Sequence, residues 1–346
     1  MTNGGMSMAI IVKKQTSGNK KNIDKKDMEQ HIYWQAHQST STVMPENTMA
    51  AFMYAWELGG IPEADIRTTS DGVIICMHDS TPARTTDAPD SQRSLPVSSF
   101  TLEQVKKWDA GIKTGELYRG EMVPALKEAF EVMKQKKDRL LYLDLKEVDL
   151  GSLGKLINEY GVNNQIIFTH YNEDNCRQMY KTVEDIKTML WIGGTPDKIK
   201  GKFNKVLSEN FYGLNQIQIH LYSRKDNKKD NKKDSNKDSN EDNNNDSNKG
   251  INKVNNDKVI GIDYDNKNSN MALTCEEWPY EIDKAFLEYA YDKTLTAGLD
   301  LEVLPFEFDD SSIHTILNIG IRWFAVDFPE RFISSVKKWE DKLTSK

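Results

Sequence analysis

Short apolar runs alternate with amphipathic stretches along most of the chain. Nine of these runs have the length and side-chain content of strands: IYWQAH, IPEADIR, VIICMHD, LLYLDLK, QIIFTH, TMLWIGG, IQIHLY, LDLEVLPF and RWFAVDF. Apolar side chains recur at helical spacing over residues 47–58, 101–107, 125–136, 151–160, 173–182, 279–296 and 310–318. Such alternation is typical of a parallel sheet, so the sequence predicts a closed (β/α)8 TIM barrel first and an open doubly wound sheet second.

Nine strands are predicted, one more than the eight strands of such a barrel. Only residues 68–72 separate IPEADIR from VIICMHD, whereas a parallel connection needs roughly a dozen residues. The second run is therefore predicted to turn back antiparallel to the first, as an extra hairpin strand. If Asp71-Gly72 forms a two-residue turn, Asp65 lies opposite His78, and Glu63 shares the face of Asp65.

Two polar tracts interrupt the pattern. Residues 1–30 are polar and rich in lysine, so we expect a flexible N-terminal arm. Residues 225–258 are almost wholly Asn, Asp, Lys and Ser, a composition that buries little apolar surface and predicts a disordered loop insertion. Because patterned sequence resumes beyond it, residues 31–346 are predicted to form a single barrel that this insertion interrupts.

Composition narrows the class of protein. The chain is 38% hydrophobic and 29% charged, with a net charge of −7, which argues against general nucleic-acid binding. No apolar run is long enough to span a bilayer, and the N-terminal stretch lacks the order of a signal peptide. Cys76, Cys176 and Cys275 are far apart and odd in number, so no disulfide framework or zinc site is predicted. These features together predict a cytoplasmic protein.

Polar side chains gather where the predicted strands end. In a barrel these carboxyl ends form the rim on which chemistry takes place. Glu63, Asp65 and Asp144 would form an oxygen-rich site there, suited to a hard divalent cation such as Ca²⁺ or Mg²⁺. Two histidines beside a metal would form an acid–base pair near neutral pH. The other polar strand ends are His37, Lys146, His170, His220 and Asp327.

Several motifs resemble, in order and spacing, those of the glycerophosphodiester phosphodiesterase family of TIM-barrel phosphodiesterases. They are PENTMAAFMYAWELGG, EADIRTTSDGVIICMHD, VPALKEAF, YLDLK and VDFPERF. The resemblance runs from about residue 36 to the motif AVDFPERF, and it implies a TIM barrel with a small insertion near the hairpin. It also implies hydrolysis of a small-molecule glycerophosphodiester to glycerol 3-phosphate and an alcohol.

The resemblance implies metal ligands and acid–base groups at matching positions. Glu63 and Asp65 stand in the Glu-x-Asp motif and correspond to ligands of the divalent cation. Asp144 stands where the family usually has Glu, and it corresponds to the third ligand. His37 and His78 correspond to the general acid–base pair.

Two further positions would bind the substrate phosphate. Lys146 matches the lysine of the Glu-x-Lys motif, and Gln38 stands where the family has Arg after the first histidine. Arginine would hold a phosphate by a bidentate, charge-assisted contact, which glutamine cannot reproduce. Either Lys146 and the metal suffice for the phosphate, or the protein handles a different diester or has lost catalysis.

Three alternatives to a glycerophosphodiesterase stand beside it. The first is a phospholipase-D-like enzyme acting on lysolipids or sphingolipids. The second is a catalytically impaired barrel that binds a phosphodiester or polyol. The third, a Schiff-base aldolase using Lys146, is disfavoured because the surrounding acids should keep the amine protonated.

Overall fold

The computed structural model describes residues 31–39, 43–224 and 278–345. The predicted arm over residues 1–30 and the predicted insertion over 225–258 lie outside these described residues. No helix within the described ranges has both the length and the apolar character needed to cross a membrane. Cys76 and Cys176 are both buried as free thiols.

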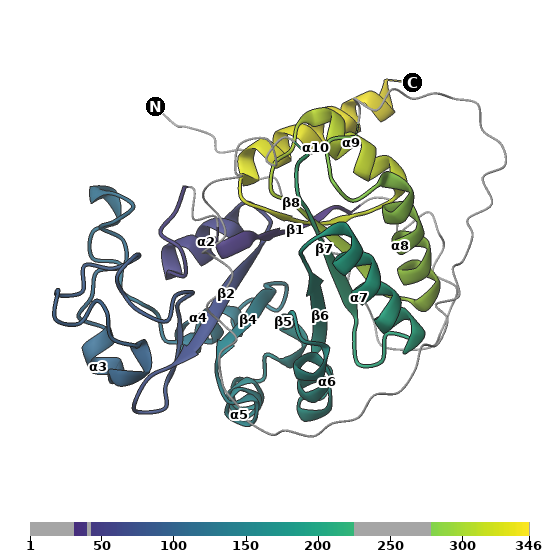
Figure 1. Cartoon of the computed structure of the whole chain (residues 1–346). Helices are drawn as coiled ribbons and strands as arrows, with labels where there is room; N and C mark the ends of the chain where they lie inside the picture. Colours follow the sequence, from purple (N-terminus) through teal and green to yellow (C-terminus); the bar gives the residue numbers. More distant parts are fainter. Residues whose placement is uncertain (1–30, 40–42, 225–277, 346) are drawn as a thin grey trace, which may run out of the picture.

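Eight parallel strands close into a barrel, in the order β1-β9-β8-β7-β6-β5-β4-β2, with β1 pairing to β2 to complete the ring (Figure 1). The predicted TIM barrel is therefore confirmed, and the open doubly wound sheet is wrong. The barrel strands are β1 Tyr33–Ala36, β2 Ile61–Thr68, β4 Leu141–Glu147, β5 Ile166–His170, β6 Lys187–Ile192, β7 Gln216–Leu221, β8 Asp300–Pro305 and β9 Trp323–Val326.

The ninth predicted strand, β3 Ile74–Cys76, is antiparallel to β2, as the short connection requires. The predicted register is wrong by one residue, because Ile66 pairs with Cys76 and Asp65 accordingly lies beside Met77 rather than His78. The cause is the turn. Thr69 and Val73 close a three-residue loop, and Gly72 at its end has a φ of 79°.

Helices occupy the connections between the barrel strands. They are α2 Met49–Glu57, α3 Leu102–Val105, α4 Leu126–Met133, α5 Leu150–Tyr160, α6 Glu173–Thr182, α7 Pro196–Ser208, α8 Lys284–Ala297, α9 Asp310–Ile319 and α10 Pro329–Thr344. The short 3-10 helices are η1 His37–Ser39, η2 Val97–Ser99, η3 Glu116–Tyr118 and η4 Asn163–Gln165. Helices α7 and α10 were not predicted, although both begin with proline in the first turn.

Side chains that favour helix starts stand before most of the longer helices. Thr48 precedes α2, and its hydroxyl accepts a hydrogen bond from the backbone N–H of Ala51. The same kind of bond begins α5 to α9, and the capping residues are Asp149, Asn172, Thr195, Asp283 and Asp309. The helices α5, α6, α7 and α9 each begin within five residues of the preceding strand, so the rim loops before them are short.

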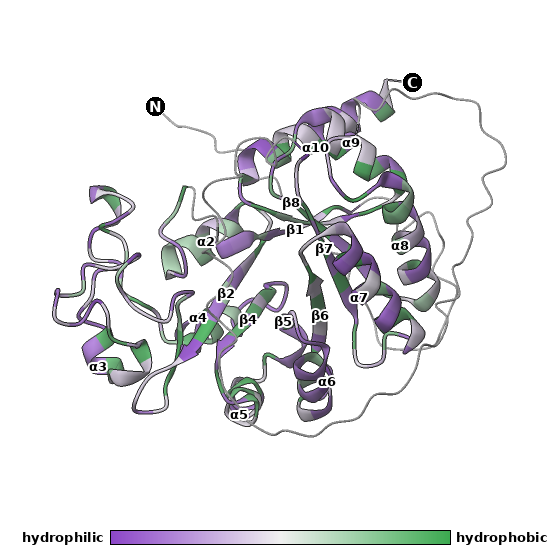
Figure 2. Ribbon diagram, viewed as in Figure 1, coloured by the Kyte–Doolittle hydropathy of each residue, from purple (hydrophilic) through white to green (hydrophobic). Residues whose placement is uncertain are grey.

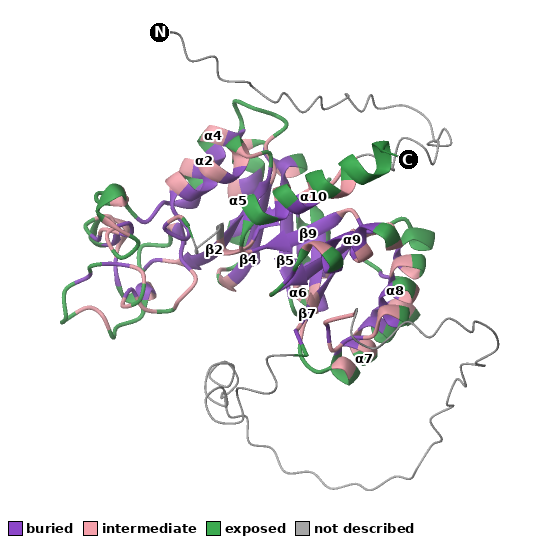
Figure 3. Cartoon of the chain, turned by 90° about the horizontal axis from the view of Figure 1, so that it is seen from above, coloured by how far each residue is buried: buried purple, intermediate pink, exposed green. Residues whose placement is uncertain are grey.

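The main core lies between the barrel strands and the surrounding helices. The strands are largely buried, and the exposed faces of the helices point outward (Figure 3). Hydropathy follows much the same division, with polar outer helix faces and mostly apolar strands, although β2 is partly hydrophilic (Figure 2). Ile75, Phe100 and Trp108 belong to a second, smaller core that supports the insertion between β3 and α4. That insertion carries α3 and lies at one side of the barrel (Figure 1).

The interior of the barrel contains a buried polar group beneath the rim. Glu302 on β8 is completely buried, and its Oε2 accepts hydrogen bonds from the Tyr142 hydroxyl at 3.0 Å and from Gln216 Nε2 at 2.6 Å. Burial raises the pKa of Glu302 to about 8, so the carboxyl group is mostly protonated at neutral pH.

Candidate active site

Two neighbouring strands place three carboxylates side by side. In the parallel ladder of β2 and β4, Asp65 pairs with Asp144, and Glu63 lies two residues earlier on the same face of β2. One oxygen of each carboxylate lies within 4.8 Å of the others. All three residues are buried, with exposed fractions of 5%, 1% and 6% for Glu63, Asp65 and Asp144. The structure therefore brings together the three acids that the sequence singles out, and their role as ligands stays a prediction.

Burial and charge disturb the ionisation of these acids. Burial raises the pKa of Glu63 to about 7, and the charges of Asp65 and Asp144 add to the effect while His37 opposes it. The pKa of Asp144 is raised as well, chiefly by burial. Burial acts in the same direction on Asp65, but Lys146 and other partners outweigh it and lower the pKa. Three carboxyl groups this close cannot all ionise without nearby positive charge.

Lys146 supplies one such charge. Its Nζ lies 2.9 Å from Asp144 Oδ2 and 3.4 Å from Asp65 Oδ1. Burial opposes the ammonium charge, yet the two aspartates raise the pKa of Lys146 above its usual range. Lys146 is therefore held as a cation at the edge of the acidic cluster, and a single ammonium offsets only part of the negative charge.

The acidic cluster fits a hard divalent cation. Asp144 Oδ1 is buried and has no hydrogen-bond partner among the described residues. An unpaired buried acceptor costs about 1–3 kcal/mol, and a cation held between the carboxylates would remove that cost. The donor set contains only oxygen, which suits Mg²⁺ or Ca²⁺ better than a softer metal.

Backbone and amide groups hold two of the acids in place. Asn47 donates from Nδ2 to Asp65 Oδ2 at 2.7 Å, and its Oδ1 accepts from the Asp65 backbone N–H at 2.8 Å. The backbone N–H of Gln38 donates to Glu63 Oε2 at 2.8 Å. Both Asn47 and Gln38 adopt left-handed backbone conformations, with φ of 55° and 45°. The loops around the site are thus bent so that polar groups face the carboxylates.

His37 stands at the end of β1 and is oriented by an acid from the far end of the sequence. Its Nδ1 lies 2.7 Å from Oδ1 of Asp327, the residue that directly follows β9. Burial works to lower the pKa of His37, but the Asp327 contact and the charges of Glu63 and Asp65 raise it to about 9. Since β1 and β9 are neighbours in the barrel, barrel closure creates this pair.

His78 stands just beyond β3 and is oriented by its sequence neighbour. Its Nδ1 lies 2.9 Å from Asp79 Oδ1, and this hydrogen bond raises the pKa of His78. The His78 backbone oxygen accepts from Arg67 Nε on β2 at 2.9 Å, which fixes the chain as it leaves the hairpin. His78 thus comes near the cluster without pairing opposite Asp65.

Other polar strand ends have structural partners. His170 Nδ1 accepts from the Asn172 backbone N–H at 3.1 Å, at the start of α6. His220 stacks on Trp191 with ring centres 5.1 Å apart, and burial lowers the pKa of His220 to about 3.

An arc of aromatic side chains lies over the ends of strands β5 to β8, on the other side of the rim from the acidic residues of β2 and β4. Its members are Tyr171, Trp191, His220, Tyr222 and Phe306.

Trp323 is not part of this aromatic arc. It stands at the start of β9, stacks on Tyr33 at 4.2 Å and is only 8% exposed. Strand starts lie at the barrel end opposite the rim, so Trp323 packs in the core and does not line the mouth of the site.

Sequence reasoning missed several supporting residues. Asn47 stands just before the helix cap Thr48, and its side chain binds Asp65. Arg84 was not singled out, although it contacts both Glu46 and Asp79. A single sequence carries no signal for these contacts, because Asn47 and Arg84 lie in irregular loops whose paths depend on the finished barrel.

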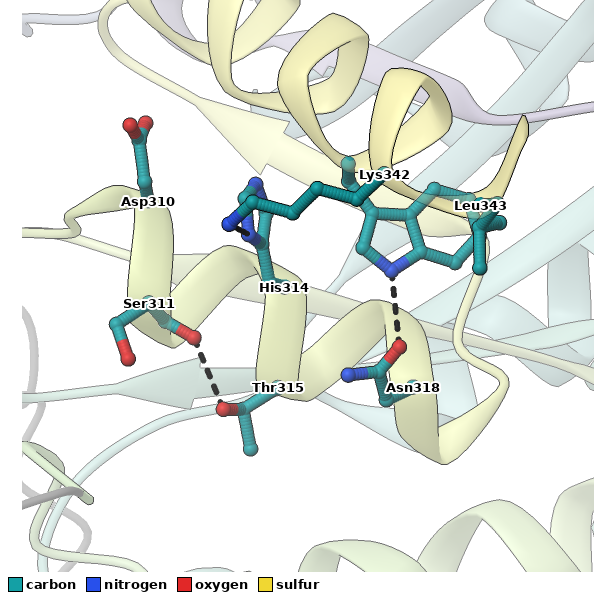
Figure 4. Close-up of a pocket in the computed structure, with 8 residues that line it drawn as sticks. Asp310, Ser311, His314, Thr315, Asn318, Lys342 and Leu343 are labelled. Carbon is teal, nitrogen blue, oxygen red and sulfur yellow. Dashed lines mark hydrogen bonds between the residues drawn. The ribbon is translucent and has the colours of Figure 1, made fainter. Parts of the chain in front are cut away.

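A surface hollow of about 510 Å³ lies between α9 and α10, away from the rim (Figure 4). Its polar groups satisfy one another. Trp339 Nε1 donates to Asn318 Oδ1, and Lys342 Nζ lies 3.4 Å from His314 Nδ1. These contacts join the two helices, so we interpret the hollow as a gap in the packing of α9 against α10 and not as a ligand site.

Comparison with known proteins finds similarity along most of the chain. The model of the glycerophosphoryl diester phosphodiesterase family matches residues 37–331. A glycerophosphodiester phosphodiesterase of Caldanaerobacter subterraneus subsp. tengcongensis is 39% identical over 163 residues, which cover 45% of this chain and 64% of that protein. The match thus spans less than two thirds of that relative.

Solved structures share the fold. The glycerophosphodiester phosphodiesterase of Agrobacterium tumefaciens is similar with a TM-score of 0.56 and 17% identity, covering 88% of this chain and 99% of that one. An Oleispira antarctica phosphodiesterase, solved with the product sn-glycerol-3-phosphate, is similar with a TM-score of 0.58 and 19% identity. That match covers 89% of this chain and 97% of the other.

Proposed function

The chain belongs to the glycerophosphoryl diester phosphodiesterase family, and we propose that it hydrolyses glycerophosphodiesters to glycerol 3-phosphate and an alcohol. The observation that carries this proposal is the meeting, at one end of the barrel, of an acidic cluster with two aspartate-bound histidines. The names of the relatives support it, as does the product held by the Oleispira antarctica neighbour.

The two histidines would move the protons. Each imidazole is held through Nδ1 by a carboxylate, His37 by Asp327 and His78 by Asp79. A ring fixed in this way presents Nε2 for proton transfer, as in other acid–base sites. One histidine would protonate the leaving alcohol oxygen while the other takes a proton from the attacking nucleophile, and water completes the hydrolysis.

The charged groups around the histidines would bind the phosphodiester. Glu63, Asp65 and Asp144 would hold a divalent cation, and this cation would polarise phosphate oxygens and offset charge in the transition state. Lys146 stands beside two of these acids as an ammonium group, so it can bind a phosphate oxygen by charge. Its raised pKa makes it a poor amine nucleophile, which argues against Schiff-base chemistry.

The aromatic arc would accommodate the carbon skeleton of the substrate. Phe306 lies 6.2 Å from the His37 ring, so the arc begins next to the proposed acid–base pair. If the phosphate of a diester binds at the acidic residues of β2 and β4, one of its two ester groups would extend to the aromatic arc. Apolar contact with the aromatic rings is favourable there.

Product analysis on sn-glycero-3-phosphocholine tests the proposal. In the presence of Mg²⁺ or Ca²⁺, we expect glycerol 3-phosphate and choline, with greatly reduced turnover in the control variants His78→Ala and His37→Ala. Glycerol and phosphocholine as products would contradict the proposed bond cleavage. Turnover restricted to lysophosphatidylcholine would favour a phospholipase-D-like enzyme, and tight binding without turnover of any diester would favour a binding barrel.

A further inference from the structure

Arg84 is the centre of an ion-pair network behind His78. Its Nε donates to Asp79 Oδ2 and its Nη2 to Asp79 Oδ1, both at 2.8 Å. On the other side, Nη1 donates to Glu46 Oε2 at 2.6 Å and Nη2 to Glu46 Oε1 at 2.7 Å. Arg84 thus joins the loop before α2 to the loop after β3, with a bidentate contact at each end.

These contacts engage both carboxylate oxygens of Asp79. The same Oδ1 that accepts from Arg84 also meets His78 Nδ1 at 2.9 Å. The side chains of His78 and Asp79 are 34% and 28% exposed, so packing alone does not immobilise them. Glu46, in contrast, has a side chain that is only 7% exposed, and it anchors the far side of the guanidinium group.

We propose that Arg84 is a positioning residue, which fixes Asp79 and through it the ring orientation of His78. The planar guanidinium fork matches two carboxylates at once, and a lysine ammonium cannot reproduce that geometry. Nε, Nη1 and Nη2 all point to these carboxylates, so Arg84 is not arranged as a clamp for the substrate phosphate. Only the catalytic consequence rests on the proposed function, since the orientation of His78 exists without substrate.

The first test observes His78 directly, in protein without substrate. Two-dimensional ¹⁵N NMR of the histidine rings, assigned with a His78→Gln variant, reports which ring nitrogen carries the proton. In the wild-type protein we expect a hydrogen on His78 Nδ1. In Arg84→Gln and in Arg84→Lys we expect the His78 signals to move toward the averaged values of a free imidazole, while those of other histidines stay.

Arg93→Gln is the matched control. Arg93 lies in the same insertion, has a 41% exposed side chain and donates to Asp90, but it contacts neither histidine. Its replacement should leave the His78 signals unchanged. If Arg84→Gln folds with unchanged His78 signals, the proposal is wrong, whatever the activity of the protein. If Arg84→Gln does not fold, Arg84→Lys decides by the same criterion.

The second test is kinetic and uses the double variant. Arg84→Gln should lower kcat roughly 10–100-fold with little change in KM, as expected when a proton-transfer group is misplaced. In a His78→Ala background, measured on a p-nitrophenyl phosphodiester, Arg84→Gln should cost almost nothing further. An equal loss in both backgrounds, or a rise confined to KM, would show that Arg84 acts on the substrate or the fold and would overturn the proposal.

Discussion

At the residue scale, the site depends on how each carboxylate is held. The strand pattern was enough to select Glu63, Asp65 and Asp144, because acids interrupt otherwise apolar strands. It was not enough to find Asn47, which lies in a loop and adopts a left-handed conformation only in the folded chain. Side chains on strands follow a period of two, whereas loop side chains follow no period that a sequence reveals.

Asn47 offers a test that separates side chain from backbone. Asn47→Ala and Asn47→Gly both remove the two hydrogen bonds to Asp65, one to its carboxylate and one from its backbone N–H. A bond to a charged group contributes about 1.5–3 kcal/mol, so we expect both variants to lower kcat/KM by roughly 10-fold or more. Only alanine also strains the backbone at a φ of 55°, which should lower its free energy of unfolding by about 1 kcal/mol relative to glycine. Denaturant unfolding and steady-state kinetics measure the two effects. Wild-type activity in the glycine variant would contradict the role given to Asn47.

Gln38 offers a second test, at the position where the chain departs from its family. The Gln38 contact to Glu63 comes from the backbone, so Gln38→Arg keeps it and adds a charge beside the rim. Replacing a neutral hydrogen bond to phosphate by a charge-assisted one should gain about 1–2 kcal/mol, or roughly 5–30-fold in kcat/KM. Gln38→Met, of similar length and without a donor, is the control and should lower kcat/KM. A folded but inactive Gln38→Arg would mean that this position shapes a different substrate site.

At the scale of elements, strand register brings the site together. The nine strands could be predicted because each is a short apolar run, and the antiparallel direction of β3 followed from its short connection. The exact register of the hairpin could not, since Asp71-Gly72 is compatible with a loop of two or three residues. Helix α7 was overlooked even though Thr195 and Pro196 form an ordinary helix start, so that omission was avoidable.

The conformation of Gly72 in the hairpin turn before β3 should make stability sensitive to substitution at this position. Gly72 has a φ of 79°, and a Cβ there would meet open space, so substitution costs backbone energy and no clash. Gly72→Ala should lower the free energy of unfolding by about 1 kcal/mol, and Gly72→Asn by less, because asparagine tolerates this conformation. Both variants should keep wild-type kcat. Equal stability of the alanine variant and the wild type would contradict the observed turn.

At the scale of the whole molecule, barrel closure joins residues that are far apart in the sequence. His37 and Asp327 meet because β1 pairs with β9, and the predicted TIM barrel implied that neighbourhood. The loop network of Glu46, Arg84 and Asp79 was beyond prediction, because its loops have no repeating pattern. The barrel was thus predictable from local patterns, whereas the supports of the site were not.

The raised pKa of Glu302 inside the barrel should make the stability of the protein depend on pH. The pKa of Glu302 is raised to about 8 in the folded chain from 4.5, so between these pH values the folded state binds the extra proton. The free energy of unfolding of the wild type should therefore fall as pH rises from about 5 to 8, by up to about 1.4 kcal/mol per pH unit from this group. Glu302→Gln lacks this contribution, so its stability relative to wild type should increase over the same range.

Urea unfolding at several pH values measures this difference. Glu288→Gln on α8 is the control, because Glu288 is half exposed and its difference from wild type should stay nearly flat. A difference between Glu302→Gln and wild type that does not change from pH 5 to 8 would show that Glu302 ionises normally inside the barrel.

The proposed hydrolysis requires a divalent cation, which the cluster of Glu63, Asp65 and Asp144 would hold. The most direct measurement is turnover of sn-glycero-3-phosphocholine after exhaustive chelation, followed by return of Mg²⁺ or Ca²⁺, with elemental analysis of the protein at each step. We expect loss of turnover with loss of the metal, recovery with the added ion, and no recovery in Asp144→Asn. Undiminished turnover in wild-type protein shown to be free of metal would contradict this requirement.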